Sequence, residues 1–400
     1  MMAQAGETTV HREIFLIRQH YPLFGAPALH HCRCCRRHLV AWLSNRLVYL
    51  IALVAVLLLF SGCTRVPRYE ELQETRAVLP TPAPGVKADG RARFREIFCA
   101  LVQNQGLSPE QRETECDTLL WRLADEPLQQ AESPVPALDP ALQVFVVGGA
   151  FSDCFGTASI AYRDAVERLS AEGYPVGGLA IGSRSSSEHN ARMMAEGLAG
   201  TPDGPVMLVG YSKGAVDILY FLANYPDLAR RVVAVLSVAG PIRGSEVARQ
   251  GIWAYDTFLS GAFAQRCDPG DGGVLDSLLP ETRLEWLLQH PLPDTVRFYS
   301  LVAFTTREHI ARALMPTWKI LASSDLRNDG QLTIADGIWP GSTLLGYVNS
   351  DHWGVAIDIE EELSFLAARP DDRLYPRGLL FEAALRYVAE DLREAVNVVR

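Results

Sequence analysis

Residues 205–214, with the sequence PVMLVGYSKG, constrain the fold of this chain more than any other segment. Residues 205–210 form a continuous apolar run, which is typical of a parallel strand buried on both faces. The run leads directly into Gly-x-Ser-x-Gly, and a helical pattern follows over residues 215–225. A serine on such a tight turn between strand and helix is exposed at the carboxyl end of the strand. The segment therefore predicts an α/β sheet that presents the hydroxyl of Ser212 as a nucleophile.

The same alternation of strand and helix patterns continues through the chain after Pro140. It predicts a mostly parallel sheet with helices on both faces, whose ligand site lies beyond the carboxyl ends of the strands. The expected strands are residues 141–147, 176–181, 205–210, 230–240, 297–304 and 343–350. The expected helices are residues 157–173, 189–200, 215–225 and 379–396.

Length and composition fit an enzyme or a small-molecule binding protein. The chain has 400 residues, of which 48% are hydrophobic, enough for a large buried core. Its formal net charge of -10 argues against nucleic acid as a partner, because phosphate binding depends on clustered Lys and Arg. We expect a leader over residues 1–63, a tether and small helical region over residues 64–140, and the α/β domain over residues 141–400.

The leader has the pattern of an export signal. Residues 47–60 form an unbroken apolar run that follows a basic stretch and precedes Ser-Gly-Cys. The run is shorter than the roughly 20 residues that a membrane-spanning helix needs. Its ending resembles the lipobox of bacterial lipoproteins, which makes Cys63 the expected lipid anchor and predicts a membrane-anchored periplasmic location. An uncleaved signal anchor and an ordinary transmembrane or buried helix are the alternatives.

Residues 30–38, with the sequence HHCRCCRRH, are a weak candidate for a zinc site. Their thiols are crowded as Cys-x-Cys-Cys, whereas tetrahedral zinc sites usually draw on two spaced pairs. Positive charge is also expected on the cytoplasmic side of an apolar run. We therefore predict neither a metal site nor a cofactor.

Four cysteines follow the leader, and an oxidising compartment would allow them to pair. Cys99 and Cys116 bracket an expected helix–turn–helix formed by residues 95–102 and 108–123, so they are the favoured pair. Cys154 and Cys267 would then pair by elimination. Buried free thiols are the alternative.

A serine nucleophile needs a base and an acid, expected in the chain order Ser, Asp, His. His352 fits the base, because it follows the last expected strand, whereas the other histidines of the domain lie before the nucleophile or in helical segments. Asp329 of the turn-forming Asn-Asp-Gly is the favoured acid. Asp325 is its rival and Asp336 a third candidate; Asp351 is adjacent to the histidine and so poorly placed to face it.

The oxyanion hole should take one backbone N–H from Lys213, directly after the nucleophile. The second should come from Ala150 or Phe151, because the bare Gly148-Gly149 before them lets the backbone approach a substrate. We expect the Lys213 side chain to be solvated at the start of its helix.

Together, Gly-Tyr-Ser-Lys-Gly, the segment AGPIRGS at residues 239–245, Asn-Asp-Gly and Asp-His-Trp-Gly resemble the bacterial lipase and esterase branch of the α/β-hydrolase superfamily. The resemblance extends from residue 141 to the C-terminus; Gly148-Gly149 replaces the usual His-Gly. It implies an α/β-hydrolase fold and ester or acyl hydrolysis by Ser212, Asp329 and His352. The segment 246–293 lies where this fold often carries a helical cap. Its aromatic residues could form an acyl pocket or the core of the cap: Trp253, Tyr255, Phe258, Phe263 and Trp286.

Two classes of function follow. The favoured one is a membrane-tethered carboxylesterase or lipase that cleaves small-molecule or lipid esters through an acyl-Ser212 intermediate, with acyl transfer to another acceptor as a variant. The other is a catalytically silent hydrolase-fold lipoprotein that binds an envelope partner. Hydrolysis of chromogenic esters would distinguish them.

Overall fold

The computed structural model describes residues 88–103, 116, 118–123, 126–127, 133–154, 156–254, 268–358 and 375–399. The leader with Cys63, the zinc candidate at residues 30–38, and Cys267 lie outside these residues. Within the described ranges, no helix is both long enough and apolar enough to cross a membrane.

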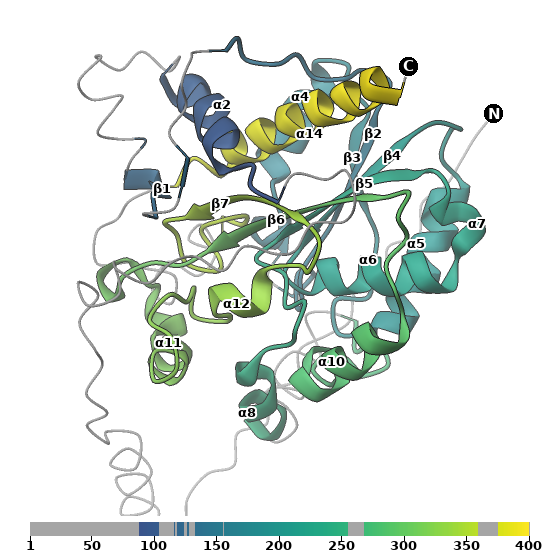
Figure 1. The fold of residues 1–400 in the computed structure, drawn as a ribbon. Coiled ribbons are helices and arrows are strands. Elements are labelled where there is room, and N and C mark those ends of the chain that lie inside the picture. The colour runs from purple at the N-terminus through teal and green to yellow at the C-terminus, as the bar shows by residue number, and fades with distance from the viewer. Residues whose placement is uncertain are drawn as a thin grey trace, which may run out of the picture. The chain divides into compact units, whose positions relative to one another are not determined.

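A seven-stranded sheet organises the described residues (Figure 1), and its strand order is β1-β7-β6-β5-β4-β2-β3. All neighbouring strands are parallel except β1 and β7, which pair antiparallel. The strands are β1 (Leu120–Trp121), β2 (Gln143–Val147), β3 (Val176–Leu179), β4 (Val206–Tyr211), β5 (Val232–Val238), β6 (Arg297–Ala303) and β7 (Thr343–Val348). Six of them match the strands expected from the apolar runs.

Helices cover both faces of the sheet. In Figure 1, α2, α4 and α14 lie on one side of it, and α5, α6 and α12 lie on the other. The helices are α2 (Arg91–Gln103), α4 (Arg163–Ala171), α5 (Ser187–Ala199), α6 (Lys213–Asn224), α7 (Pro226–Ala229), α8 (Glu246–Ala254), α10 (Pro280–Gln289), α11 (Met315–Leu321), α12 (Ile334–Gly337) and α14 (Arg377–Val399). The predicted fold class is confirmed.

Strand β4 shows how the apolar runs build two cores. Side chains alternate along a strand, and Met207 and Val209 face the core beneath α2, α4 and α14. Val206 and Leu208 face the opposite core, which contains apolar side chains of α5 and α6. All four are buried, and full burial of such a side chain contributes about 1.5–3 kcal/mol. A strand buried on both faces therefore carries the Ser212 turn at its end.

The region before Pro140 differs from expectation. The second predicted helix does not continue to residue 123, because Leu120–Trp121 forms strand β1 against Tyr347 and Val348 of β7. An open sheet edge offers unpaired backbone groups, and pairing with them outweighs the helical pattern. Helix α2 also packs on β7. Residues of this region thus complete the same sheet.

The expected Cys99–Cys116 disulfide is confirmed, with a Cα–Cα distance of 5.5 Å. Cys154 is also disulfide-bonded; its expected partner, Cys267, is outside the described residues.

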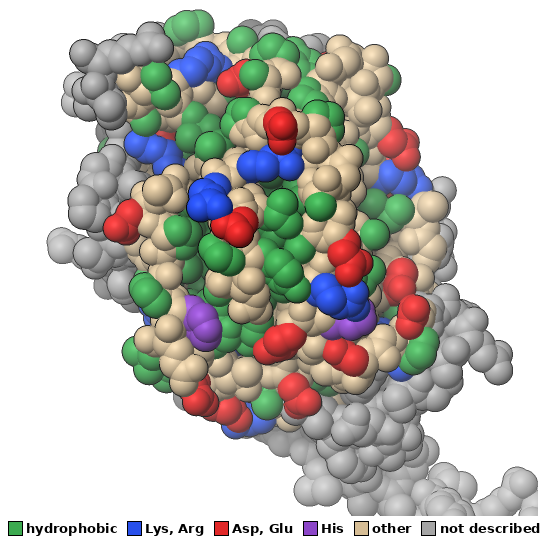
Figure 2. Space-filling view, turned by 90° about the vertical axis from the view of Figure 1, so that its right-hand side faces the viewer, with side chains coloured by type: hydrophobic (Ala, Val, Ile, Leu, Met, Phe, Trp, Pro, Cys, Tyr) green, Lys and Arg blue, Asp and Glu red, His purple; other side chains and the backbone are tan. Residues whose placement is uncertain are grey.

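The described parts of the expected cap insertion are α8, the 3₁₀ turn η4 (Asp276–Leu278) and α10. Figure 1 shows α8 and α10 beyond the end of the sheet at which β4 leads into α6, that is, beyond the carboxyl end of β4. On the face shown in Figure 2, Lys and Arg side chains stand singly beside Asp and Glu, so the charge there is of mixed sign.

Trp286 of α10 belongs to the core on the α5 and α6 side of the sheet. It stacks on Tyr220 with ring centroids 4.7 Å apart, and the buried guanidinium carbon of Arg283 lies 4.9 Å from the Trp286 ring. Trp286 does not line the cavity described below. The remaining cap aromatics named from the sequence, at positions 253, 255, 258 and 263, have no described side chains.

Candidate active site

Ser212 occupies a sharp turn between β4 and α6. Its backbone has φ 52° and ψ -128°, a combination outside the regions that non-glycine residues normally adopt. Strain of this kind costs about 1–3 kcal/mol and persists only where the surroundings enforce it. Here the Ser212 amide donates to the Val238 carbonyl at 3.0 Å, and the Ser212 carbonyl accepts from the Ala215 amide at 3.0 Å.

The two glycines of the motif are required by space. A Cβ atom on Gly214 would lie 2.2 Å from the Val147 carbonyl oxygen, and one on Gly210 would lie 2.4 Å from the Ala215 Cα. Both contacts are with backbone, which cannot move without displacing β2 or α6. The Gly-x-Ser-x-Gly pattern therefore reflects the close approach of the helix to the strands.

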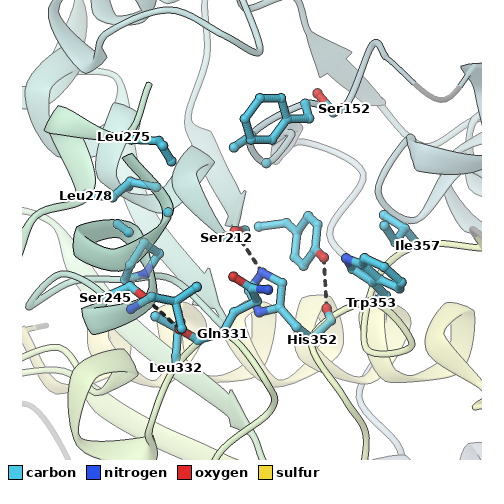
Figure 3. A pocket seen from close by; sticks show the side chains of 18 of the residues that line it. Ser152, Ser212, Ser245, Leu275, Leu278, Gln331, Leu332, His352, Trp353 and Ile357 are labelled. Atoms are coloured by element: carbon cyan, nitrogen blue, oxygen red, sulfur yellow. Dashed lines mark hydrogen bonds between the residues drawn. The ribbon is translucent and has the colours of Figure 1, made fainter. Parts of the chain in front are cut away.

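Three side chains separated in the sequence form one hydrogen-bonded chain. His352 Nε2 lies 2.9 Å from Ser212 Oγ (Figure 3), and His352 Nδ1 lies 2.8 Å from Asp329 Oδ2. His352 is 6% exposed and Asp329 is 1% exposed, so water competes little for either hydrogen bond. The structure brings together the three residues that the sequence singled out.

Of the three acid candidates, Asp329 is the one that reaches the histidine. Its Oδ1 accepts hydrogen bonds from the amides of Gln331 and Leu332, both at 2.8 Å, which leaves Oδ2 facing the imidazole. The rival Asp325 is paired with Arg327 instead, at 2.9 Å.

Asp336, the third acid candidate, belongs to the capping box of α12. Its Oδ2 accepts from Thr333 Oγ1 at 2.7 Å. Burial raises the pKa of this carboxyl above its ordinary value.

The long segment between β6 and Asp329 returns to its starting point. The Thr305 amide, just beyond β6, donates to the Asn328 carbonyl at 3.3 Å, and the indole of Trp318 on α11 donates to the Thr305 carbonyl at 3.3 Å. The Asp329 carbonyl then accepts from the His352 amide at 2.9 Å. These contacts therefore place the acid near the end of β6 despite the separation in sequence.

Tyr211 supports the histidine, which the sequence did not reveal. Its hydroxyl donates to the His352 carbonyl at 2.8 Å. Burial, together with the nearby carboxylates of Asp329 and Asp351, raises the pKa of Tyr211 well above its ordinary value, so the phenol stays protonated and can donate. Its position directly before the nucleophile in the motif was the available signal.

The backbone near Ser212 corrects one oxyanion-hole candidate. The Phe151 amide already donates to the Ser183 carbonyl at 3.0 Å, so it is not available to a substrate. The amides of Ala150 and Lys213 donate to no other group among the described residues. A Cβ atom on Gly149 would lie 3.0 Å from Ser212 Cβ, which accounts for a glycine at this position. Ala150 and Lys213 thus remain as the candidate donors.

The Lys213 side chain is not solvated, contrary to expectation. It is fully buried, and its Nζ lies 2.5 Å from Asp217 Oδ1 on the next turn of α6. The cause is the packing of α5 against α6, which covers the first turn of α6, while Asp217 supplies the opposite charge that a buried ammonium requires.

A cavity of about 360 Å³ lies over Ser212. Figure 3 shows Leu275 and Leu278 on one side of the serine, and Trp353 and Ile357 on the other. The expected insertion contributes aliphatic side chains to this lining rather than Trp286. In the described part of the chain, no three His, Cys, Asp or Glu side chains are grouped as a metal site.

Gly251 of α8 also lines the cavity. A Cβ atom added there would meet only Leu275 Cδ1, at 4.0 Å, so this helical glycine leaves open space at the wall. Residues of α8 and η4 therefore determine how large a group fits on the cap side of Ser212.

The fold is that of an α/β hydrolase, with Ser212 on the turn between β4 and α6. No protein-family model matches the chain, and no curated protein matches its sequence. Among solved structures, a metagenomic carboxyl esterase is 40% identical, with a TM-score of 0.68 over 80% of this chain and 98% of that one. The chain therefore belongs to the α/β-hydrolase superfamily.

Two further solved structures are similar at lower identity. The mature lipase BlEst2 of Bacillus licheniformis is 20% identical, with a TM-score of 0.43 over 58% of this chain and 93% of that one. Lipase 1 from Pelosinus fermentans is 12% identical, with a TM-score of 0.42 over 61% of this chain and 98% of that one.

Proposed function

We propose that the protein is a serine hydrolase that cleaves carboxylic esters through an acyl-Ser212 intermediate. The observation that carries the proposal is the hydrogen-bonded chain from Asp329 through His352 to Ser212, whose hydroxyl lies beneath an apolar cavity. The 40% identical carboxyl esterase supports the same substrate class.

In the first half of the reaction, Ser212 Oγ attacks the ester carbonyl carbon, and His352 Nε2 accepts the hydroxyl proton. The carbonyl oxygen becomes an oxyanion, to which the Ala150 and Lys213 amides donate. The tetrahedral intermediate then collapses: the bond to the alcohol breaks, and the imidazolium gives its proton to the departing oxygen. An acyl-serine remains.

In the second half, His352 takes a proton from water, and the resulting hydroxyl attacks the acyl carbonyl carbon. The second intermediate collapses to the carboxylic acid, and Ser212 Oγ regains its proton from the imidazolium. Asp329 keeps the proton on Nδ1, so that Nε2 is free to accept, and it stabilises the imidazolium.

The substrate we propose is an uncharged ester with an apolar portion, from either a small molecule or a lipid. Apolar surface released from water stabilises the complex by roughly 25 cal/mol per Å². Leu275, Leu278 and Trp353 supply such surface around Ser212. A charged group would lose its hydration there without a partner.

We also propose that the enzyme acts outside the cytoplasm, tethered to a membrane through Cys63. The Cys99–Cys116 disulfide supports an oxidising compartment. Replacing Cys63 with Ser should release soluble or unprocessed protein, as measured by fractionation and mass. Unchanged membrane retention after signal cleavage would exclude the lipid anchor.

The nucleophile is tested with a fluorophosphonate probe, which reacts with activated serines. The wild type should be labelled at Ser212, and Ser212→Ala should not be labelled. Ser152→Ala, which removes another hydroxyl of the same cavity, serves as the matched control and should be labelled like the wild type. Equal labelling of wild type and Ser212→Ala would refute the assignment.

A further inference from the structure

A buried carboxylate with no role in the reaction above lies one turn into the nucleophile helix. Asp217 of α6 is fully buried and accepts hydrogen bonds from Ser187 Oγ at 2.6 Å, Asn190 Nδ2 at 2.7 Å and Lys213 Nζ at 2.5 Å. Its three partners are also fully buried. A buried charge is tolerated only when it is paired and hydrogen-bonded, so the four groups depend on one another.

One branch of this network ends at the first expected oxyanion donor. The Lys213 side chain is held by Asp217, and the backbone amide of Lys213 is the free N–H next to the nucleophile. Because the two residues are four apart on one helix, their ion pair spans the first turn of α6. It thus constrains the residue whose amide would face the oxyanion.

The second branch leads to the other donor. Asn190 Oδ1 accepts from the Gly182 amide at 2.9 Å, which fixes the loop between β3 and α5. In that loop, the Ser183 carbonyl accepts from the Phe151 amide at 3.0 Å, and Ser183 Oγ donates to Asp153. The segment that carries the Ala150 amide is therefore fastened to a loop that Asp217 holds through Asn190.

The network also reaches the cap. Ser187, which donates to Asp217 through its hydroxyl, donates through its amide to Ser277 Oγ of η4 at 3.0 Å. Leu275 and Leu278, on either side of Ser277, line the cavity. Asp217 thus connects α6, the loop before α5 and one wall of the cavity.

We propose that Asp217 is a positioning residue that sets the two halves of the oxyanion hole, the Lys213 amide and the Ala150 amide, relative to each other. The inference rests on the proposed function, because it concerns the transition state of ester cleavage. Backbone donors stabilise an oxyanion only at hydrogen-bonding distance, and loss of one donor costs about 10²–10³ in kcat in a well-studied protease. A displaced donor should cost less.

The test is Asp217→Asn, which keeps the shape and removes the charge that Lys213 requires. We expect kcat to fall roughly 10- to 100-fold, with KM changed by less than about threefold, because the oxyanion exists only in the transition state. Its matched control is Asp391→Asn on α14. Asp391 is another largely buried carboxylate, which accepts from Tyr299 at 2.6 Å and from Arg297 at 2.8 Å. That variant should keep wild-type kcat.

The measurement that a purely structural role would not affect is inhibition by two matched ketones. A trifluoromethyl ketone adds to Ser212 and forms an oxyanion, whereas the methyl ketone of the same chain binds without one. In Asp217→Asn, the inhibition constant of the trifluoromethyl ketone should rise by the factor by which kcat/KM falls. That of the methyl ketone should stay within about twofold, because ground-state binding is preserved.

Asn190→Ala provides a second perturbation in case Asp217→Asn does not fold. It cuts the link to Gly182 and leaves the ion pair of Lys213 and Asp217, so it should show a smaller loss of kcat with the same ketone pattern. Equal loss of kcat in Asp391→Asn, equal weakening of both ketones, or unchanged kcat in the folded variants would overturn the proposal. An inactive wild type would instead refute the proposed function.

Discussion

Replacing Asp329 with Asn should abolish nearly all turnover while leaving the fold intact. The change exchanges one oxygen for an NH₂ group of similar size at a site that is 1% exposed. The direction in which the new amide points decides the outcome. The amides of Gln331 and Leu332 both donate to Asp329 Oδ1, so the amide oxygen must occupy that position, and the NH₂ group must face His352.

The magnitude follows from this orientation. An NH₂ group facing Nδ1 makes that nitrogen an acceptor, so the imidazole proton moves to Nε2, 2.9 Å from Ser212 Oγ. An Nε2 that carries a proton cannot accept another from the serine. The same exchange in a serine protease triad lowers kcat about 10⁴-fold, which corresponds to about 5 kcal/mol of transition-state stabilisation. We expect a loss of that order here.

The assay is the initial rate of nitrophenyl ester hydrolysis, with thermal unfolding measured alongside. Asp325→Asn is the control, because Asp325 pairs with Arg327 and does not contact His352. That variant should keep activity within about threefold, because the Asp325 carboxylate lies outside the hydrogen-bonded chain of Ser212, His352 and Asp329. If Asp329→Asn retained a tenth or more of the wild-type kcat, or if Asp325→Asn lost as much, the assignment of the acid would be refuted.

Two further predictions concern the cavity and the disulfide. Gly251→Leu should lower kcat/KM for octanoate esters at least about tenfold and for acetate esters less than about threefold, since a few buried methylenes decide such discrimination. Equal losses on both esters in Gly251→Leu would contradict the role of this position in chain-length selection. The smaller change Gly251→Ala should raise the free energy of unfolding by up to about 1 kcal/mol. Replacing Cys99 and Cys116, 17 residues apart, with Ala should lower the free energy of unfolding by about 3 kcal/mol in chemical denaturation. No change in midpoint would show that the bond adds nothing.

The sequence predicted the residues that follow directly from strand ends. Ser212 was identified because a strand, a tight turn and a helix pattern meet there, and His352 because it follows the last strand. Asp329 was favoured over Asp325 as the acid only because it lies in the turn-forming sequence Asn-Asp-Gly. The hydrogen bond from the Thr305 amide to the Asn328 carbonyl, which returns this segment to β6, joins two backbone groups, and no side-chain pattern signals it.

What the sequence could not predict depends on packing between distant segments. Lys213 looked solvated because lysine at a helix start usually is, and only the cover provided by α5 buries it. The Phe151 amide was an expected oxyanion donor, but it donates to the carbonyl of Ser183, which lies 32 residues later in the chain. Likewise, Leu120–Trp121 has a helical pattern and becomes a strand because β7 offers an open edge.

Backbone strain links these findings. Ser212 has φ 52° and Phe151 has φ 62°, both in the region that favours glycine. Each such conformation costs about 1–3 kcal/mol and persists only where neighbouring contacts enforce it. The contacts that hold them come from different segments: the Val238 carbonyl at the end of β5 accepts from the Ser212 amide, and the Ser183 carbonyl in the loop before α5 accepts from the Phe151 amide. A site built in this way needs a group that fixes the two segments to each other. Asp217 bonds to Lys213 beside the Ser212 turn and to Asn190 of α5, which in turn accepts from the Gly182 amide of the loop that carries Ser183.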